Sequence, residues 1–332
     1  MINKILYNLF YYKTLIQSFL FPKSFAVTAY KLFETPKLPP KIPQWEKDFE
    51  KENEFNIFKI PYSEHIDTIK ERMVKNSTAF EITRIPNFPE ELTVLEYLPN
   101  PNVPKREETI ICVHGWDGRG FNYFKFIPKF QEKGFRVLTP DFPRHGKTGG
   151  VESGCHVFGH SINALIRYVN APVYVLAHSL GNGAFCINYG ISNETEKKLV
   201  KRYAGIAIPD KFTDIVEIFE NMIGIARRCH PYFLAENNKN LGFDISKMVF
   251  GEIINNYKIP TLLIHDKKDK ELDFNKACLS ANLLPHKNYK VNGQIKPCFY
   301  KSEGLGHRRI LRDDDIVDRI VEFFSEDIEL QD

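Results

Sequence analysis

One serine, two aspartates and one histidine of this 332-residue chain stand where they could act together. Ser179 directly follows the apolar run PVYVLAH, and Asp266 ends the run IPTLLIHD. Asp269 comes three residues later, and His307 lies in the glycine-rich stretch EGLGHRR. A serine hydroxyl becomes a nucleophile when a histidine takes its proton and a carboxylate orients that histidine. These residue types therefore predict nucleophilic acyl transfer, with one of the two aspartates as the acid.

The elements that must position these residues form an alternating pattern. Short apolar runs typical of buried strands occupy residues 109–115, 135–141, 172–178, 202–209, 259–266 and 296–304. Helical patterns lie between or after them, at residues 121–133, 156–169, 180–190, 273–283 and 313–325. This alternation predicts a parallel sheet covered by helices on both faces. Because ligands bind beyond the carboxyl ends of such strands, we expect one rim to carry His114, Asp141, Ser179, Asp266, Asp269 and His307.

The remaining segments predict additions to this sheet. Residues 55–98 contain the strand-like runs FNIFKIPY, AFEITRIP and LTVLEYL, which we expect to pair antiparallel with it. Residues 210–259 interrupt the alternation with largely helical patterns and predict a helical cap above the sheet. The proline-rich stretch at 33–44 reads as an extended connector. We therefore expect an N-terminal helix with its connector at 1–44 and a larger domain at 45–332.

The chain order Ser179, Asp269, His307 and the surrounding motifs resemble the α/β-hydrolase fold family over residues 90–325. The family's Gly-x-Ser-x-Gly turn corresponds to AHSLG at 177–181, in which alanine replaces the first glycine. Asn182 stands where a further glycine often follows. The resemblance implies an α/β-hydrolase fold, with a mostly parallel central sheet flanked by helices and a helical cap insertion.

A second motif, VHGWDGRG at 113–120, resembles the oxyanion loop of the same family. The resemblance implies that the backbone N–H groups of Trp116 and Leu180 stabilise the oxyanion. His114 is expected to shape the loop and not to act as a catalyst. The loop PDFPRHGKTGG at 140–150 is also similar to a family loop and supports the fold alone.

The resemblance implies that Ser179 is the nucleophile, His307 the base and Asp269 the acid, with Asp266 as the fallback. It implies a serine hydrolase that cleaves a carboxylic ester, or a related acyl bond, through an acyl-enzyme intermediate. A thioesterase, a lipase or an acyltransferase would use the same residues, and a non-catalytic binding module is a further alternative. Apolar side chains in the cap favour an apolar small-molecule substrate, although they could equally form the core of the cap.

Composition excludes other classes of function. The 45 basic and 42 acidic side chains leave a net charge of only +3, and no basic run is present, so nucleic-acid binding is disfavoured. The six cysteines show no metal-binding spacing, and we expect reduced thiols in a cytoplasmic protein. Neither a metal nor an organic cofactor is expected.

The N-terminal segment carries an apolar stripe at helical spacing, made of Ile2, Ile5, Leu6, Leu9, Tyr12, Ile16, Phe19 and Leu20. Polar residues interrupt it, so it is not a membrane-spanning helix. We expect the stripe to pack on the body of the protein. The alternatives are weak peripheral contact with a membrane surface and a signal peptide cleaved near residue 29.

Overall fold

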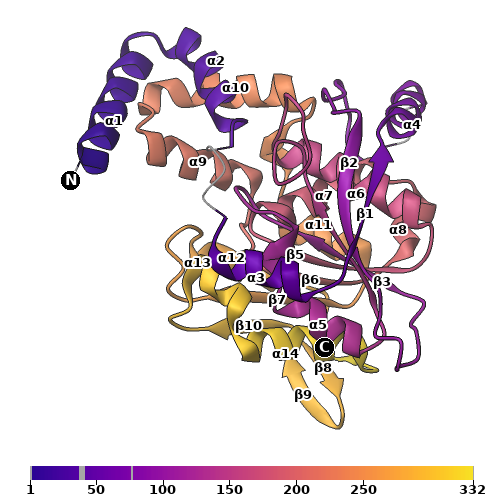
Figure 1. Cartoon of the computed structure of the whole chain (residues 1–332). Helices are drawn as coiled ribbons and strands as arrows, with labels where there is room; N and C mark the ends of the chain where they lie inside the picture. The colour runs from indigo at the N-terminus through magenta and orange to yellow at the C-terminus, as the bar shows by residue number, and fades with distance from the viewer. Residues whose placement is uncertain (1, 37–41, 76–77, 332) are drawn as a thin grey trace.

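A mostly parallel sheet of eight strands forms the centre of the molecule (Figure 1). The computed structural model describes residues 2–36, 42–75 and 78–331. From one edge to the other, the strands are β1 (Asn56–Pro61), β2 (Glu91–Tyr97), β4 (Arg136–Asp141), β3 (Thr109–Val113), β5 (Val173–His178), β6 (Val200–Ile206), β7 (Thr261–Asp266) and β10 (Phe299–Ser302). Antiparallel pairing joins β1 to β2 and β2 to β4, and all the remaining neighbouring strands of this sheet pair in parallel. The predicted α/β architecture is confirmed.

Helices cover both faces of this sheet (Figure 1). One layer contains α5 (Phe126–Glu132) and α14 (Asp314–Ser325), which pack together. The other contains α6 (Cys155–Val169), α7 (Leu180–Ile191), α8 (Glu194–Leu199), α11 (Phe250–Tyr257) and α12 (Phe274–Asn282). Every residue of β3, β5 and β7 is consequently buried, which explains why these strands are mostly apolar.

The segment between β6 and β7 is helical, as the sequence predicted. It contains α9 (Phe212–Ile223), the 3₁₀ turn η2 (Arg227–Cys229), α10 (His230–Leu241), the 3₁₀ turn η3 (Ile245–Lys247) and α11. Of these, α11 packs against α7 and α12. We therefore use the word cap for residues 212–247 alone.

Two helices, α1 (Ile2–Leu20) and α2 (Pro22–Phe33), form an N-terminal hairpin that packs on the cap (Figure 1). The sequence predicted that the apolar stripe of α1 packs on the body, and this prediction is wrong. The members of the stripe whose side chains the structure describes are all exposed: Ile5, Leu6, Leu9, Tyr12, Ile16, Phe19 and Leu20. Within the described residues, no helix is long and apolar enough to cross a membrane.

Other segments also differ from the sequence prediction. Residues 63–74 form helix α4 (Ser63–Val74) between the first two strands. The run at 79–86 is not a strand. Ala79 and Thr83 donate their N–H groups to the carbonyls of Gly190 and Gly242, which do not belong to a strand. A small second sheet contains β8 (Asn288–Val291), β9 (Gln294–Pro297) and β11 (Glu329–Gln331). Short helices α3 (Gln44–Glu52) and α13 (Gly306–Arg309) flank the site described next.

Candidate active site

Ser179 lies on the tight turn that joins β5 to α7. Its backbone has φ 55° and ψ −123°, a conformation that a non-glycine residue rarely adopts. The buried Asn182 holds this turn, because its side chain donates hydrogen bonds to the carbonyls of Ser179 and Ile206, each at 2.9 Å. Asn182, which stands where a glycine often follows in the family, therefore stabilises the strained turn at Ser179.

The helix after Ser179 approaches the neighbouring strand so closely that glycine is required. A Cβ atom on Gly181 would lie 2.6 Å from the carbonyl oxygen of Val113, at the end of β3. A Cβ atom on Gly115 would lie 2.9 Å from the Cβ atom of Ser179. Both contacts are closer than a side chain allows, so these two glycines let the strand ends and the serine turn meet.

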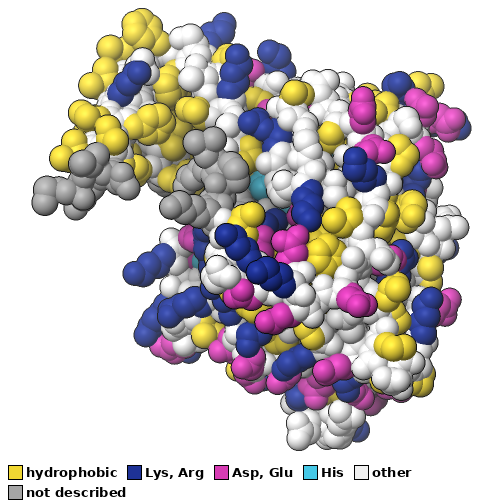
Figure 2. Space-filling model, viewed as in Figure 1, with side chains coloured by type: hydrophobic (Ala, Val, Ile, Leu, Met, Phe, Trp, Pro, Cys, Tyr) yellow, Lys and Arg dark blue, Asp and Glu magenta, His cyan; other side chains and the backbone are white. Residues whose placement is uncertain are grey.

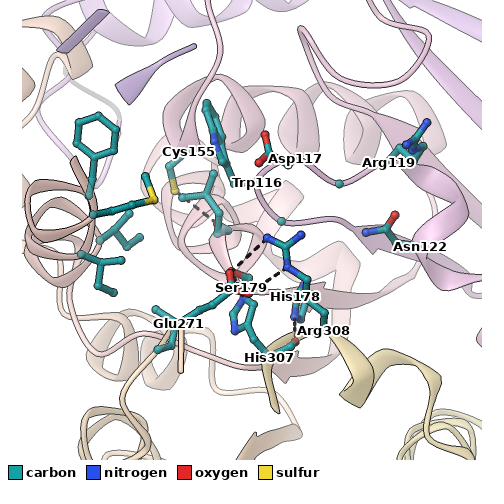
Figure 3. Close-up of a pocket in the computed structure, with 18 of the residues that line it drawn as sticks. Trp116, Asp117, Arg119, Asn122, Cys155, His178, Ser179, Glu271, His307 and Arg308 are labelled. Atoms are coloured by element: carbon teal, nitrogen blue, oxygen red, sulfur yellow. Dashed lines mark hydrogen bonds and ion pairs between the residues drawn. The ribbon is translucent and has the colours of Figure 1, made fainter. Parts of the chain in front are cut away.

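His307 bridges Ser179 and Asp269. Its Nε2 atom lies 2.9 Å from the Ser179 hydroxyl oxygen, and its Nδ1 atom lies 2.8 Å from Oδ2 of Asp269 (Figure 3 shows the serine and the histidine). The histidine comes from α13 and the aspartate from the turn after β7. With a proton on Nδ1, donated to the carboxylate, Nε2 is left as the acceptor for the serine hydroxyl.

The Asp269 carboxylate is kept in its charged form. Its Oδ1 atom accepts the backbone N–H groups of Glu271 and Leu272 at 2.8 and 2.9 Å. Burial alone raises the pKa of this carboxyl, but the hydrogen bonds and the charge of His307 outweigh burial, so the pKa lies below its ordinary value. An ionised Asp269 can therefore orient His307 and stabilise its cation.

Asp266, the fallback acid in the sequence prediction, contacts a different group of atoms. Its buried carboxylate accepts hydrogen bonds from the N–H groups of Lys268, Gly304 and Leu305 and from the Ser302 hydroxyl, at 2.9 to 3.2 Å. Burial raises its pKa, but these donors more than offset burial and hold the pKa at about 2. Asp266 thus ties the turn after β7 to the loop that carries His307.

His178 also positions this loop, and sequence reasoning assigned it no role. Its Nε2 atom lies 2.9 Å from the backbone carbonyl oxygen of His307. Burial, reinforced by the nearby His307, lowers the pKa of His178 to about 3, so its ring is neutral and Nε2–H donates this hydrogen bond. The available signal was a histidine at the end of an otherwise apolar strand.

The oxyanion loop predicted at 113–120 packs beside the serine turn. The His114 ring is buried, and its Nδ1 atom lies 2.8 Å from the Gly115 carbonyl while Nε2 accepts the N–H of Phe142 at 3.2 Å. His114 therefore shapes the loop, as expected. Trp116 and Leu180 line the same cavity as Ser179 and His307. Leu180 is the first residue of α7, so its N–H has no acceptor within that helix.

Comparisons with known proteins agree with this architecture. A model of the alpha/beta hydrolase family matches residues 110–227. A solved esterase of Pyrococcus furiosus has a TM-score of 0.55 at 16% identity, with 88% of this chain and 98% of that chain covered. The chain has the fold of the α/β hydrolases. An α/β hydrolase from a Medee basin deep-sea metagenome gives a TM-score of 0.50 at 12% identity, covering 72% of this chain and 96% of that chain. No curated protein sequence matches this chain.

The candidate site opens into a largely apolar cavity of about 600 Å³ (Figure 3). Segments distant in sequence supply its apolar wall, with Phe10, Leu32 and Phe33 from the N-terminal hairpin and Ile218, Phe219 and Met222 from α9. One ion pair of the cavity lining lies beside His307. There Arg308 pairs with Glu271 at 3.0 Å, and Glu271 lies 3.9 Å from Nε2 of His307.

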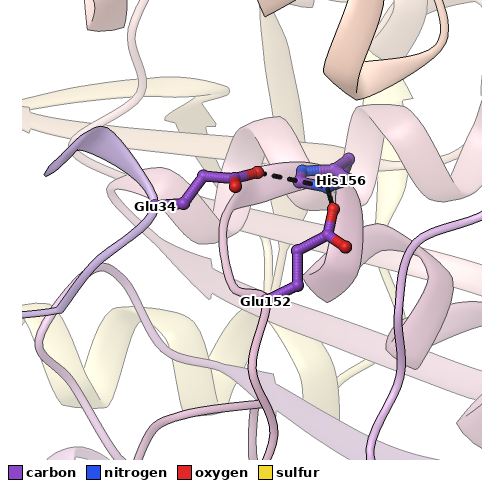
Figure 4. Close-up of side chains that lie close together, drawn as sticks. All are labelled: Glu34, Glu152 and His156. Carbon is purple, nitrogen blue, oxygen red and sulfur yellow. Dashed lines mark hydrogen bonds and ion pairs between the residues drawn. The ribbon is translucent and has the colours of Figure 1, made fainter. Parts of the chain in front are cut away.

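Among the residues that the structure describes, one group of side chains could hold a metal by distance alone: Glu34, Glu152 and His156 (Figure 4). Nε2 of His156 lies 3.0 Å from Glu152 and 3.6 Å from Glu34. Both carboxylates have other partners, since Arg84 binds Glu152 at 2.6 and 2.8 Å and the Tyr30 hydroxyl binds Glu34. The Arg84 cation already balances the negative charge of Glu152, so the group does not fit a metal site. It fastens the end of α2 to the body.

Proposed function

We propose that the protein is a serine hydrolase that cleaves carboxylic esters with apolar acyl groups. The observation that carries this proposal is the hydrogen-bonded chain from Asp269 through His307 to Ser179, at the base of an apolar cavity. The Pyrococcus furiosus neighbour is named an esterase, which is compatible with the proposal.

In the proposed first step, Ser179 Oγ attacks the ester carbonyl carbon while its proton passes to Nε2 of His307. The carbonyl oxygen becomes an oxyanion, for which the N–H groups of Trp116 and Leu180 are the proposed donors. His307 then gives its proton to the departing alkoxide, and the alcohol leaves an acyl group on Ser179. Asp269 remains ionised throughout and stabilises the His307 cation.

In the second half, water takes the place of the alcohol. His307 removes a proton from water, the resulting hydroxide attacks the acyl-serine, and the proton returns to Ser179 Oγ as the carboxylic acid leaves. Each step uses groups of this chain together with water, and the scheme uses no metal and no organic cofactor. We also propose a reducing compartment such as the cytoplasm, which the six unpaired thiols support.

Thioesterase, lipase and acyltransferase reactions share the first half of this scheme and differ in the leaving group or the acceptor. The apolar wall formed by the N-terminal hairpin and α9 favours an acyl group of medium or long chain length. A non-catalytic binding module has less support, because all three side chains of the proposed triad are present at hydrogen-bonding distance.

Hydrolysis of p-nitrophenyl esters from C2 to C16 tests the proposal, with Ser179→Ala as the inactive variant and Ser246→Ala as a matched surface control. We expect turnover that peaks at one chain length, vanishes in Ser179→Ala and is unchanged in Ser246→Ala. A fluorophosphonate probe should label the wild type and fail to label Ser179→Ala. Equal labelling of both proteins, or turnover that survives in Ser179→Ala, would refute the assignment of the nucleophile.

A further inference from the structure

The apolar side of helix α1 faces water. Its large apolar side chains point outward, with Leu9 63% and Ile16 57% exposed. Its buried positions are instead small and polar, namely Thr14 and Ser18 at 3% and 0%. A helix on the surface of a water-soluble domain normally has the opposite arrangement.

Polar contacts explain why this arrangement of α1 is fixed. The Ser18 hydroxyl accepts the N–H of Ala226 at 2.8 Å, and the Tyr7 hydroxyl donates to the Met222 carbonyl at 2.8 Å. The ring of Tyr11 lies so close to Gly224 that a Cβ atom there would come within 2.8 Å of it. Helix α1 is therefore held on the cap through its polar side, and its apolar side faces outward.

The exposed apolar side chains of the hairpin form one continuous surface, which we call the apolar face. Figure 2 shows it as the mostly hydrophobic lobe at the upper left. Its members on α1 and at the turn to α2 are Ile5, Leu6, Leu9, Tyr12, Ile16, Phe19, Leu20 and Phe21. Exposed patches of this kind mark surfaces that contact a protein or a membrane.

Charge indicates which partner the apolar face fits. Residues 1–33 contain four lysines and neither aspartate nor glutamate. Lys13 and Lys23 are exposed, and the neighbouring 3₁₀ turn adds the exposed Arg227 and Arg228, whose guanidinium lies 4.9 Å above the Phe19 ring. Apolar side chains bordered by cations suit an anionic lipid surface, with the lysine and arginine heads at the level of the phosphates. Two copies joined through this face would bring like charges together.

The apolar face is continuous with the cavity that contains Ser179. Phe10, Leu32, Ile218 and Met222 are exposed and also line that cavity. A lipid chain at the apolar face would therefore reach the cavity along apolar side chains. No helix in the described part of the chain is long and apolar enough to cross the bilayer, so α1 would lie in the interface.

We propose that the apolar face docks on an anionic lipid bilayer and that ester substrates pass from the bilayer into the cavity. The second half of this proposal rests on the proposed function, whereas the docking does not. The docking experiment therefore uses Ser179→Ala protein, in which lipid binding is measured without turnover.

Flotation with phosphatidylcholine vesicles, with or without one quarter phosphatidylglycerol, tests the docking. We expect binding to the anionic vesicles that weakens with salt, and a loss of at least about tenfold in the combined variant Leu6→Gln, Leu9→Gln and Ile16→Gln. The matched control carries Val74→Gln, Val151→Gln and Ile295→Gln, three exposed apolar positions outside the hairpin, and should bind like the parent. A variant that combines Lys13→Gln, Lys23→Gln and Arg227→Gln should bind the anionic vesicles more weakly. Its binding to vesicles of phosphatidylcholine without phosphatidylglycerol should be unchanged.

Three outcomes would overturn the docking. In the first, the parent protein binds neither kind of vesicle, and in the second, the hairpin variant binds vesicles as well as the control variant does. In the third, light scattering shows that the parent is a dimer and the hairpin variant a monomer, while neither protein binds vesicles; the apolar face is then an interface between copies.

Active enzyme tests the route of the substrate. The hairpin variant should hydrolyse a soluble short-chain ester at the parent rate and a vesicle-embedded ester at least about tenfold more slowly. Equal losses on both esters would refute the route. Failure to hydrolyse any ester would refute the proposed function and leave the vesicle-binding result standing.

Discussion

Replacing each of the two aspartates after β7 by asparagine tests whether Asp269 is the proposed catalytic carboxylate and Asp266 a structural one. In Asp269→Asn, the side-chain oxygen can still accept the N–H groups of Glu271 and Leu272. The amide NH₂ group of the asparagine then faces Nδ1 of His307. Because this group is a hydrogen-bond donor, it favours the His307 tautomer that has its proton on Nε2. That tautomer cannot accept the Ser179 proton. We expect kcat to fall about 10⁴-fold, as in other triads, with little change in stability.

In Asp266→Asn, the expected losses are reversed. The two carboxylate oxygens of Asp266 accept four hydrogen bonds, from Lys268, Ser302, Gly304 and Leu305. The asparagine side chain has only one oxygen to accept them. The Ser302 hydroxyl can rotate to accept from the amide, but whichever way the amide is oriented, at least one partly buried backbone N–H loses its acceptor. Leaving such a donor unpaired costs about 1–3 kcal/mol. We expect that loss in the free energy of unfolding and a decrease in kcat of no more than about tenfold.

The assay measures kcat for p-nitrophenyl butyrate and the urea unfolding curve of both variants and the parent. Two results would refute the reasoning. If Asp269→Asn keeps more than a few per cent of the parent kcat, Asp269 does not orient the base. If Asp266→Asn loses as much kcat as Asp269→Asn while its unfolding curve is unchanged, the roles of the two carboxylates are exchanged.

Two further predictions concern packing and pH. Gly181→Ala should lower the free energy of unfolding by about 1–3 kcal/mol and also reduce kcat, because its Cβ atom would press on the Val113 carbonyl. Gly149→Ala meets no atom within 4 Å and should leave kcat unchanged, so equal effects of both changes would contradict the packing argument. Burial lowers the pKa of His145 to about 4 and of His178 and His160 to about 3, so the unfolded chain binds more protons than the folded chain below the ordinary pKa of 6.5. Stability should therefore be fully present above pH 6.5 and fall progressively as the pH decreases towards 3, measured by urea unfolding; a flat profile from pH 7 to 4.5 would contradict this.

The sequence predicted the sheet and the strand ends at which the candidate residues lie because the relevant signals are local. Apolar strands, each followed by a polar residue, identify the strand ends, and the topology of a parallel sheet then places Ser179, Asp269 and His307 on one rim. The structure brings these three side chains to hydrogen-bonding distance. Their catalytic roles, like the proposed oxyanion donors, stay predictions.

What the sequence did not reveal depends on contacts between distant segments. A helical stripe identifies which side of α1 is apolar, but it cannot say which side faces the protein. That choice follows from the contacts of Tyr7 and Ser18 with residues more than 200 positions later. The positioning roles of His178 and Asp266 were missed for the same reason, because their partners lie in the loop that carries His307.

Much of the apolar cavity wall comes from segments that carry none of the proposed reacting groups. Ser179, Asp269 and His307 lie at or after strand ends, whereas the hairpin and α9 supply a large part of the apolar wall. Chemistry and selectivity are therefore encoded in separate parts of the chain. Under the proposed function, redesign of residues such as Phe10 and Phe219 offers a way to change which acyl groups fit, while the strained turn at Ser179 and its hydrogen-bonded partners remain intact.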